Sequence, residues 1–167
     1  MGWNMRQKPG SHRLHATLVR IVVLMTFIAV GSLLGGREAS ANAAMAAAAQ
    51  TADGGIGACG SNSGKALYDC IANVLDKLSN DISNVNVPAT RGALQTAATK
   101  LRAAVSKAQA LSAITQCRAL ISGALAKVRA LGGGYVEGWG GGSGSGAGLA
   151  AIAGVLGHAA KLIQAKG

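Results

Sequence analysis

Residues 64–82 have the sequence GKALYDCIANVLDKLSNDI, and this stretch shows most clearly how the chain folds. Asp69, Asp76 and Lys77 fall on or near one side of it, whereas bulky apolar side chains recur elsewhere at steps of three and four residues. Such spacing is typical of an α-helix with one apolar face. The apolar positions of the predicted helix are Leu67, Cys70, Ile71, Val74, Leu75, Leu78 and Ile82.

A second helical stretch is predicted from about Ala89 to Leu131. Pro88 before it suits an early helical position, and three glycines at 132–134 are a stop signal. The stretch is longer than the usual helix of about 8 to 20 residues, which favours a break near Ser112 over one straight helix. Its apolar positions are Leu94, Leu101, Val105, Ala108, Leu111, Ile114, Ile121, Leu125 and Val128.

The segments around this helical domain, 64–131, differ in composition. Residues 42–63 are rich in Ala and Gly without periodic bulky side chains, so we expect a flexible lead-in. Residues 132–148 form a glycine-rich linker, and 149–167 repeat apolar residues at helical spacing. No strand pattern is present. We therefore expect an all-α fold: a small helical hairpin or three-helix bundle, with a Gly-rich linker to a C-terminal amphipathic helix.

The first 41 residues have the order of a secretory signal peptide. A basic start is followed by an apolar run, Ile21–Leu34, and by the small residues Ala39-Ser40-Ala41. The apolar run is shorter than the roughly 20 residues that a membrane-spanning helix needs. We expect cleavage near Ala41 and a periplasmic or extracellular product. The alternative is an uncleaved signal that anchors the protein in the membrane.

The composition indicates a thin core and a cationic product. Half of the residues are hydrophobic, but alanine dominates them and only 3% are aromatic. Alanine buries little area, so each core residue contributes little to stability. Residues 42–167 contain eleven Lys and Arg against five Asp and Glu, a net charge of +6. A positive field favours anionic partners, although net charge also serves solubility alone.

Three cysteines, Cys59, Cys70 and Cys117, lie in the exported part, where a disulfide can persist. In a hairpin that turns near Asn86, helical and extended rises place Cys117 about 46 Å from the turn and Cys59 about 50 Å from it. Cys70 lies only about 24 Å from the turn, and a disulfide requires Cα atoms within about 7 Å.

The sequence therefore predicts Cys59–Cys117 if the second stretch is straight. If that stretch folds back near Ser112, it predicts Cys70–Cys117 instead. The spacing of Cys70 from Leu67 and Val74 also fits a small unpaired core residue.

No residue pattern indicates catalysis, a cofactor or a metal site. His158 is the only histidine after residue 41, and a lone histidine on a polar helix face is usually solvated. The cysteines lack paired metal-binding spacing. Residues 60–65, GSNSGK, miss the first glycine and the final Ser or Thr of a phosphate-binding loop, which favours a turn before a helix. We expect a protein that is not an enzyme.

Residues 89–131 contain seven basic residues and no acidic residue, and this charge distribution is the most informative functional feature of the sequence. The basic residues fit a docking surface for an anionic membrane or polysaccharide or for another envelope protein, while the scarcity of aromatic residues makes nucleic acid an unlikely partner. The simpler interpretation is that Asp69, Asp76 and Asp81 pair with some of these bases. The residues expected to form this docking site for an anionic surface are Arg91, Lys100, Arg102, Lys107, Arg118, Lys127 and Arg129.

Two functions follow as expectations. The first is a non-enzymatic binding or structural protein at the cell envelope. The alternative is a secreted membrane-active polypeptide, similar to a bacteriocin or toxin, that acts through its C-terminal helix. That helix, GLAAIAGVLGHAAKLIQAKG, is cationic and amphipathic enough to lie in a membrane interface, but its small residues equally suit packing in a bundle.

Overall fold

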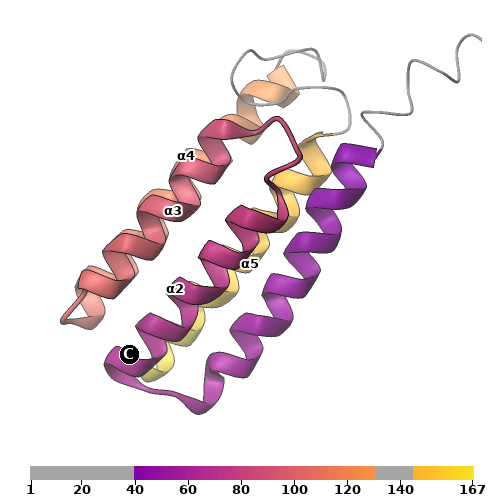
Figure 1. The fold of residues 1–167 in the computed structure, drawn as a ribbon. Helices are drawn as coiled ribbons and strands as arrows, with labels where there is room; N and C mark the ends of the chain where they lie inside the picture. Colours follow the sequence, from indigo (N-terminus) through magenta and orange to yellow (C-terminus); the bar gives the residue numbers. More distant parts are fainter. Residues whose placement is uncertain (1–39, 131–144) are drawn as a thin grey trace, which may run out of the picture. The chain divides into compact units, whose positions relative to one another are not determined.

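The computed structural model describes residues 40–130 and 145–167, and these residues form a bundle of five α-helices (Figure 1). The expected leader, apart from residues 40 and 41, and residues 132–144 of the expected linker lie outside the described ranges. The all-α class is confirmed. In chain order the elements are the first helix (residues 40–58), a 3-10 turn η1 (Cys59–Ser61), α2 (Gly64–Asp81), α3 (Pro88–Ala103), α4 (Lys107–Ala130) and α5 (Ser145–Lys166).

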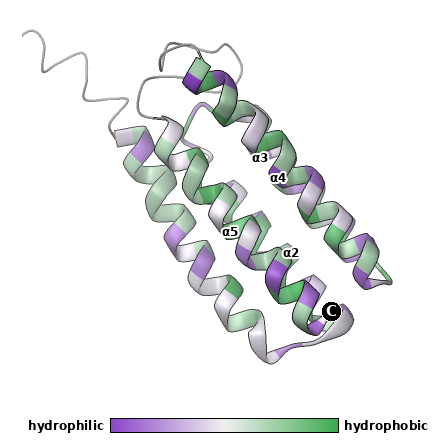
Figure 2. Cartoon of the chain, turned by 180° about the vertical axis from the view of Figure 1, so that it is seen from behind, coloured by the Kyte–Doolittle hydropathy of each residue, from purple (hydrophilic) through white to green (hydrophobic). Residues whose placement is uncertain are grey.

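The helices close into a ring in chain order. α2 packs on α3, α3 on α4, and α4 on α5. The first helix completes the ring, because its Gly55 lies against Val74 of α2 and its Met45 against Gly148 of α5. Hydrophobic and weakly polar residues predominate on all the helices, with strongly hydrophilic ones in isolated bands (Figure 2). Because the first helix and α5 both pack in this ring, the core lies between elements from both ends of the described chain.

The first helix corrects the expectation that residues 42–63 are a flexible lead-in. Residues 40–58 are helical, and one side of this helix is buried at three- and four-residue steps. Most of the buried side chains are alanines, so the stripe lacks the bulky residues by which such patterns are recognised. Alanine nevertheless has the highest helix propensity. The buried residues of this stripe are Met45, Ala48, Ala49, Ala52 and Ile56.

The turn before α2 matches the prediction from residues 60–65. Gly64 opens α2 with a φ of +53°, a left-handed conformation that favours glycine. The predicted apolar face of α2 is confirmed, since Leu67, Ile71, Leu75 and Leu78 are all buried. This turn brings the first helix back alongside α2, as Figure 1 shows.

The disulfide joins Cys59 to Cys70, with Cα atoms 5.8 Å apart, so both predicted pairings with Cys117 are wrong. The cause is the first helix. An extended lead-in would have carried Cys59 far from α2, whereas the observed turn at 59–63 places it beside the second turn of α2. Cys117 is a free thiol buried in α4. Burial raises the pKa of Cys117 to about 12, so its reactive thiolate is scarce at neutral pH.

The second helical stretch breaks at residues 104–106, several residues before the predicted Ser112. Ala104 has an extended ψ of 125°, which ends α3. Ser106 then caps α4, because its Oγ accepts a hydrogen bond of 3.3 Å from the Gln109 amide. The Gln109 side chain in turn accepts a bond of 2.9 Å from the Val105 amide. This arrangement resembles a capping box, and it explains why the helix restarts here.

α5 is part of the bundle and begins at Ser145, within the expected linker. Its apolar side chains, expected on one face, are buried against the other helices. Among the described helices only α5 is long and apolar enough to cross a membrane, a test that a buried core helix also passes. The buried residues of α5 include Leu149, Ile152, Val155, Leu156, Ala159 and Ile163.

Candidate binding groove between α4 and α5

The seven basic residues predicted as one docking surface for an anionic partner are divided between two helices. Arg91, Lys100 and Arg102 lie on α3, and the other four lie on α4. Arg102 pairs with Asp76 of α2 and donates a hydrogen bond of 2.9 Å to Asn73. Lys100 donates to the Gln116 side chain of α4 at 2.6 Å. Two of the three bases on α3 are thus occupied by neighbouring helices.

Each of the four described carboxylates contacts a basic or histidine side chain outside α4. Asp69 pairs with Lys65, Asp81 with Lys77 at 2.9 Å, and Asp76 with Arg102. Asp53 of the first helix lies 2.8 Å from His158 of α5. The interpretation that the acids of residues 64–82 pair across a hairpin therefore holds for Asp76. Asp69 and Asp81 pair within α2.

Three of the four bases of α4 form a stripe instead. Lys107, Arg118 and Arg129 are spaced by eleven residues, which is roughly three helical turns, so they share one side of α4. Neither α4 nor α5 contains an acidic residue. Lys107 donates a hydrogen bond of 3.1 Å to the Gln164 carbonyl near the end of α5. This stripe therefore follows the edge where α4 meets α5.

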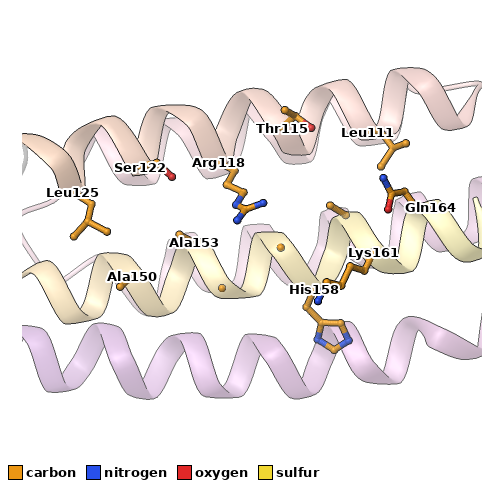
Figure 3. Close-up of a pocket in the computed structure, with 13 residues that line it drawn as sticks. Leu111, Thr115, Arg118, Ser122, Leu125, Ala150, Ala153, His158, Lys161 and Gln164 are labelled. Atoms are coloured by element: carbon orange, nitrogen blue, oxygen red, sulfur yellow. The ribbon is translucent and has the colours of Figure 1, made fainter.

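A groove of about 920 Å³ runs along that edge. Its walls carry two leucines, small residues and a few polar groups, and Arg118 projects into it from α4 (Figure 3). The groove is lined from α4 by Leu111, Thr115, Arg118, Ser122 and Leu125, and from α5 by Ala150, Ala153, Gly154, Gly157, His158, Ala160, Lys161 and Gln164.

Arg118 lies over the α5 backbone at Gly157. A Cβ added to Gly157 would sit 3.9 Å from the Arg118 Cζ, an ordinary van der Waals contact, so the guanidinium lies against this part of the groove floor. Lys161, one turn further along α5, adds a second exposed cation. No described carboxylate pairs with either base. The groove therefore combines an apolar floor with positive charge near its middle.

His158 borders the groove, but its ring points toward the first helix (Figure 3). The hydrogen bond with Asp53 holds it there. The histidine expected to be solvated thus has a carboxylate partner while keeping 41% of its side-chain surface exposed. It links the first helix to α5 and leaves Arg118 and Lys161 as the cations of the groove.

Smaller hollows lie elsewhere on the bundle. One of about 260 Å³ lies between α3 and α4 beside Lys100, Gln116 and Leu120. Another, of about 210 Å³, lies between the first helix and α2 beside Gly55 and Val74. In residues 40–130 and 145–167, no three His, Cys, Asp or Glu side chains gather where they could hold a metal ion. The α4–α5 groove is the larger and more strongly charged feature.

Sequence reasoning included Arg118 in the basic set but missed the groove. Gly157 and Lys161 were not recognised as its partners, because nothing in the sequence states that α5 lies against α4. One signal was available: positions 111, 115, 118, 122 and 125 repeat at steps of four and three, and the exposed Thr115, Arg118 and Ser122 form a second stripe beside the buried one, which includes Leu125. Such a second stripe indicates a further surface for packing.

Comparison of this chain with protein-family models, curated proteins and solved structures found no match.

Proposed function

We propose that this chain is an exported, non-enzymatic binding protein of the cell envelope, and that the α4–α5 groove receives a partner that carries negative charge. The observation that supports this proposal most strongly is the position of Arg118 above the groove floor, while the four described carboxylates contact other residues. Opposite charges across an interface favour the correct partner and speed its approach.

Two features support export. The sequence of residues 1–41 has the order of a signal peptide. The Cys59–Cys70 disulfide suits an oxidising compartment, since cytosolic thiols are kept reduced. Export is tested by fractionating cells that express the full chain and sequencing the N-terminus of the product. A start near Asn42 in the periplasm or medium is expected, whereas a cytosolic protein with its first methionine would contradict the proposal.

The binding site is tested by calorimetry on the exported protein. The probes are phosphatidylglycerol vesicles, dextran sulfate and an acidic helical peptide. Arg118→Gln should weaken binding of at least one probe about tenfold. Lys127→Gln is the matched control, because Lys127 is an exposed base of α4 outside the groove lining. Equal affinities of the two variants for every probe, or no binding at all, would contradict the proposed site.

The alternative proposal, membrane action through α5, is less well supported. Leu149, Ile152, Leu156 and Ile163 would have to enter lipid, but they are fully buried in the bundle. α5 would therefore have to leave the core before it could insert. A peptide of residues 148–167 tests this alternative by leakage of anionic vesicles. Leakage by the intact protein at similar concentrations would favour the alternative over the binding proposal.

A further inference from the structure

We infer that the α4–α5 groove docks an amphipathic α-helix of another protein, with a glutamate or aspartate at its centre and an apolar side chain seven residues to either side. This inference rests on the proposed function and names the class of partner. It follows from the spacing of the groove residues, the place of the charge within the groove and the absence of acids from its walls.

The walls of the groove have the spacing of a coiled-coil seam. On α4 the lining residues are at positions 111, 115, 118, 122 and 125, and five of the eight lining residues on α5, at 150, 154, 157, 161 and 164, form a matching set. Both sets alternate steps of four and three, which places side chains to receive a third helix. Each set spans fourteen residue-to-residue steps, or about 21 Å. A partner helix of about four turns would fill this length.

The two helices that form the walls run antiparallel, and contacts at both ends of the groove define its middle. Lys107 of α4 reaches the Gln164 carbonyl at one end, and Leu125 lies beside Gly146 of α5 at the other. Arg118 and Gly157 face each other between these ends. Small residues on α5 would let a partner backbone approach to the separation of about 8 to 10 Å that packed helices adopt.

The order of apolar and charged side chains along α4 favours a helix over a lipid as the occupant of the groove. Leu111 and Leu125 each lie seven residues from Arg118, so apolar ends flank a cationic centre at about 10 Å on each side. A fatty acid carries its charge at one end and would leave half of the groove unfilled. Leu125 is buried and Leu111 is half-buried against the core, but both still line the groove. A helix can present a carboxylate to Arg118 and pack apolar side chains against the groove-facing edges of these two leucines at once.

Charge also argues against a second copy of this chain as the occupant. α4 and α5 contain no acidic residue, so two copies that met through their grooves would bring Arg118 and Lys161 against the same cations. Like charges across an interface disfavour association. An acidic partner helix would neutralise Arg118, and Lys161 could select for a second carboxylate one turn away.

The test uses the exported protein and designed eighteen-residue helical peptides. The probe peptide has leucines seven residues to either side of a central glutamate, and its controls carry glutamine at the centre or the same residues in scrambled order. Fluorescence anisotropy should show binding of the glutamate peptide at least about tenfold tighter than that of either control. Arg118→Glu should reverse the preference toward a peptide with a central lysine.

A steric variant provides a second measurement. Gly154 lines the groove, and a Cβ there would meet nothing within 4 Å, so Gly154→Leu should fill the groove without disturbing the bundle. Gly123→Leu is the matched control, because Gly123 is equally open on α4 but outside the groove lining. Gly154→Leu should abolish peptide binding, and Gly123→Leu should change it less than about twofold.

The outcomes separate this inference from the proposed function. Equal binding of the scrambled peptide would overturn the helix inference. Arg118-dependent binding of phosphatidylglycerol vesicles or dextran sulfate without peptide binding would also overturn it, while the proposed anionic site would stand. A dimer in sedimentation analysis that dissociates in Gly154→Leu but not in Gly123→Leu would assign the groove to a second copy. Absence of binding to every probe would overturn both proposals.

Discussion

The Gly148 amide of α5 donates a hydrogen bond of 2.7 Å to the Asn42 side chain of the first helix, across 106 positions of the sequence. A Cβ at Gly148 would lie 2.7 Å from the Met45 Cβ and 3.0 Å from the Asn42 Oδ1. The two helices therefore approach closely only because residue 148 is glycine.

Gly148→Ala should lower the free energy of unfolding by about 1–3 kcal/mol, the usual cost of overpacking a core. Gly154→Ala is the control on the same helix, where an added Cβ meets nothing within 4 Å. It should raise stability by about 0.5–1 kcal/mol, since alanine loses less backbone entropy than glycine. Urea unfolding followed by circular dichroism measures both. Similar effects of the two substitutions would contradict the close approach.

The disulfide should be a major contributor to stability in a core rich in alanine. Replacing both Cys59 and Cys70 with alanine opens a loop with a sequence separation of 11. In the chain-entropy model this costs about 3 kcal/mol. The measurement is urea unfolding of the double variant against the unreduced protein.

Peptide mapping without reduction provides the independent control for that pairing. A single crosslinked Cys59–Cys70 peptide should appear, and Cys117 should react with iodoacetamide only after unfolding, because its thiol is buried. Any crosslinked peptide that contains Cys117 would contradict the observed pairing.

Cys117 should make the protein less stable as the pH rises above about 9. Burial raises the pKa of this thiol from 9.0 to about 12, so the unfolded chain loses the proton first. Between these two values the unfolded state binds fewer protons, and stability falls by up to about 1.4 kcal/mol per pH unit. Below pH 9 both states keep the proton, and the thiol adds no pH dependence.

The check is urea unfolding from pH 8 to 10.5 for the natural chain and for Cys117→Ala. The alanine variant should be less stable at pH 8, since it leaves a small cavity, but should lose less stability on going to pH 10.5. Peptide mapping after each unfolding experiment verifies that the Cys59–Cys70 disulfide has not exchanged. Parallel pH profiles would contradict the shift.

Ser106→Ala tests the start of α4. The Ser106 hydroxyl accepts a hydrogen bond from the Gln109 amide, and loss of such a cap costs about 1 kcal/mol. Ser122→Ala is the control, because Ser122 is an exposed residue inside α4, where alanine is the better helix former. Thermal unfolding should show a lower midpoint for Ser106→Ala alone. An unchanged midpoint would indicate that the α3–α4 break does not depend on this cap.

The limits of sequence interpretation follow from the size of the side chains. α2 was predicted because Leu67, Ile71 and Leu75 are bulky, whereas the first helix was missed because its buried stripe is mostly alanine. That single error also produced the wrong disulfide pairings. The break in the second stretch was expected, yet Ser106 and Gln109 mark it better than Ser112. These two residues are a local signal that the sequence alone contains.

The groove required tertiary information. Arg118 belongs to the predicted basic set, but its relation to Gly157 depends on the antiparallel placement of α5 against α4. Residues 131–144, between these helices in sequence, are outside the described ranges and carry no periodic pattern that would fix this placement. Spacing within α4 could suggest a second packing surface, but not the helix that shares it.

The pairing of the first helix with α5 also determines when the protein can finish folding. Synthesis delivers the N-terminus first, so Met45 and Asn42 emerge long before Gly148, which they contact. Until α5 arrives, the alanine stripe of the first helix has no cover on that side. A chain of this design stays incompletely folded while it is being synthesised, and it closes only after its last helix has left the ribosome.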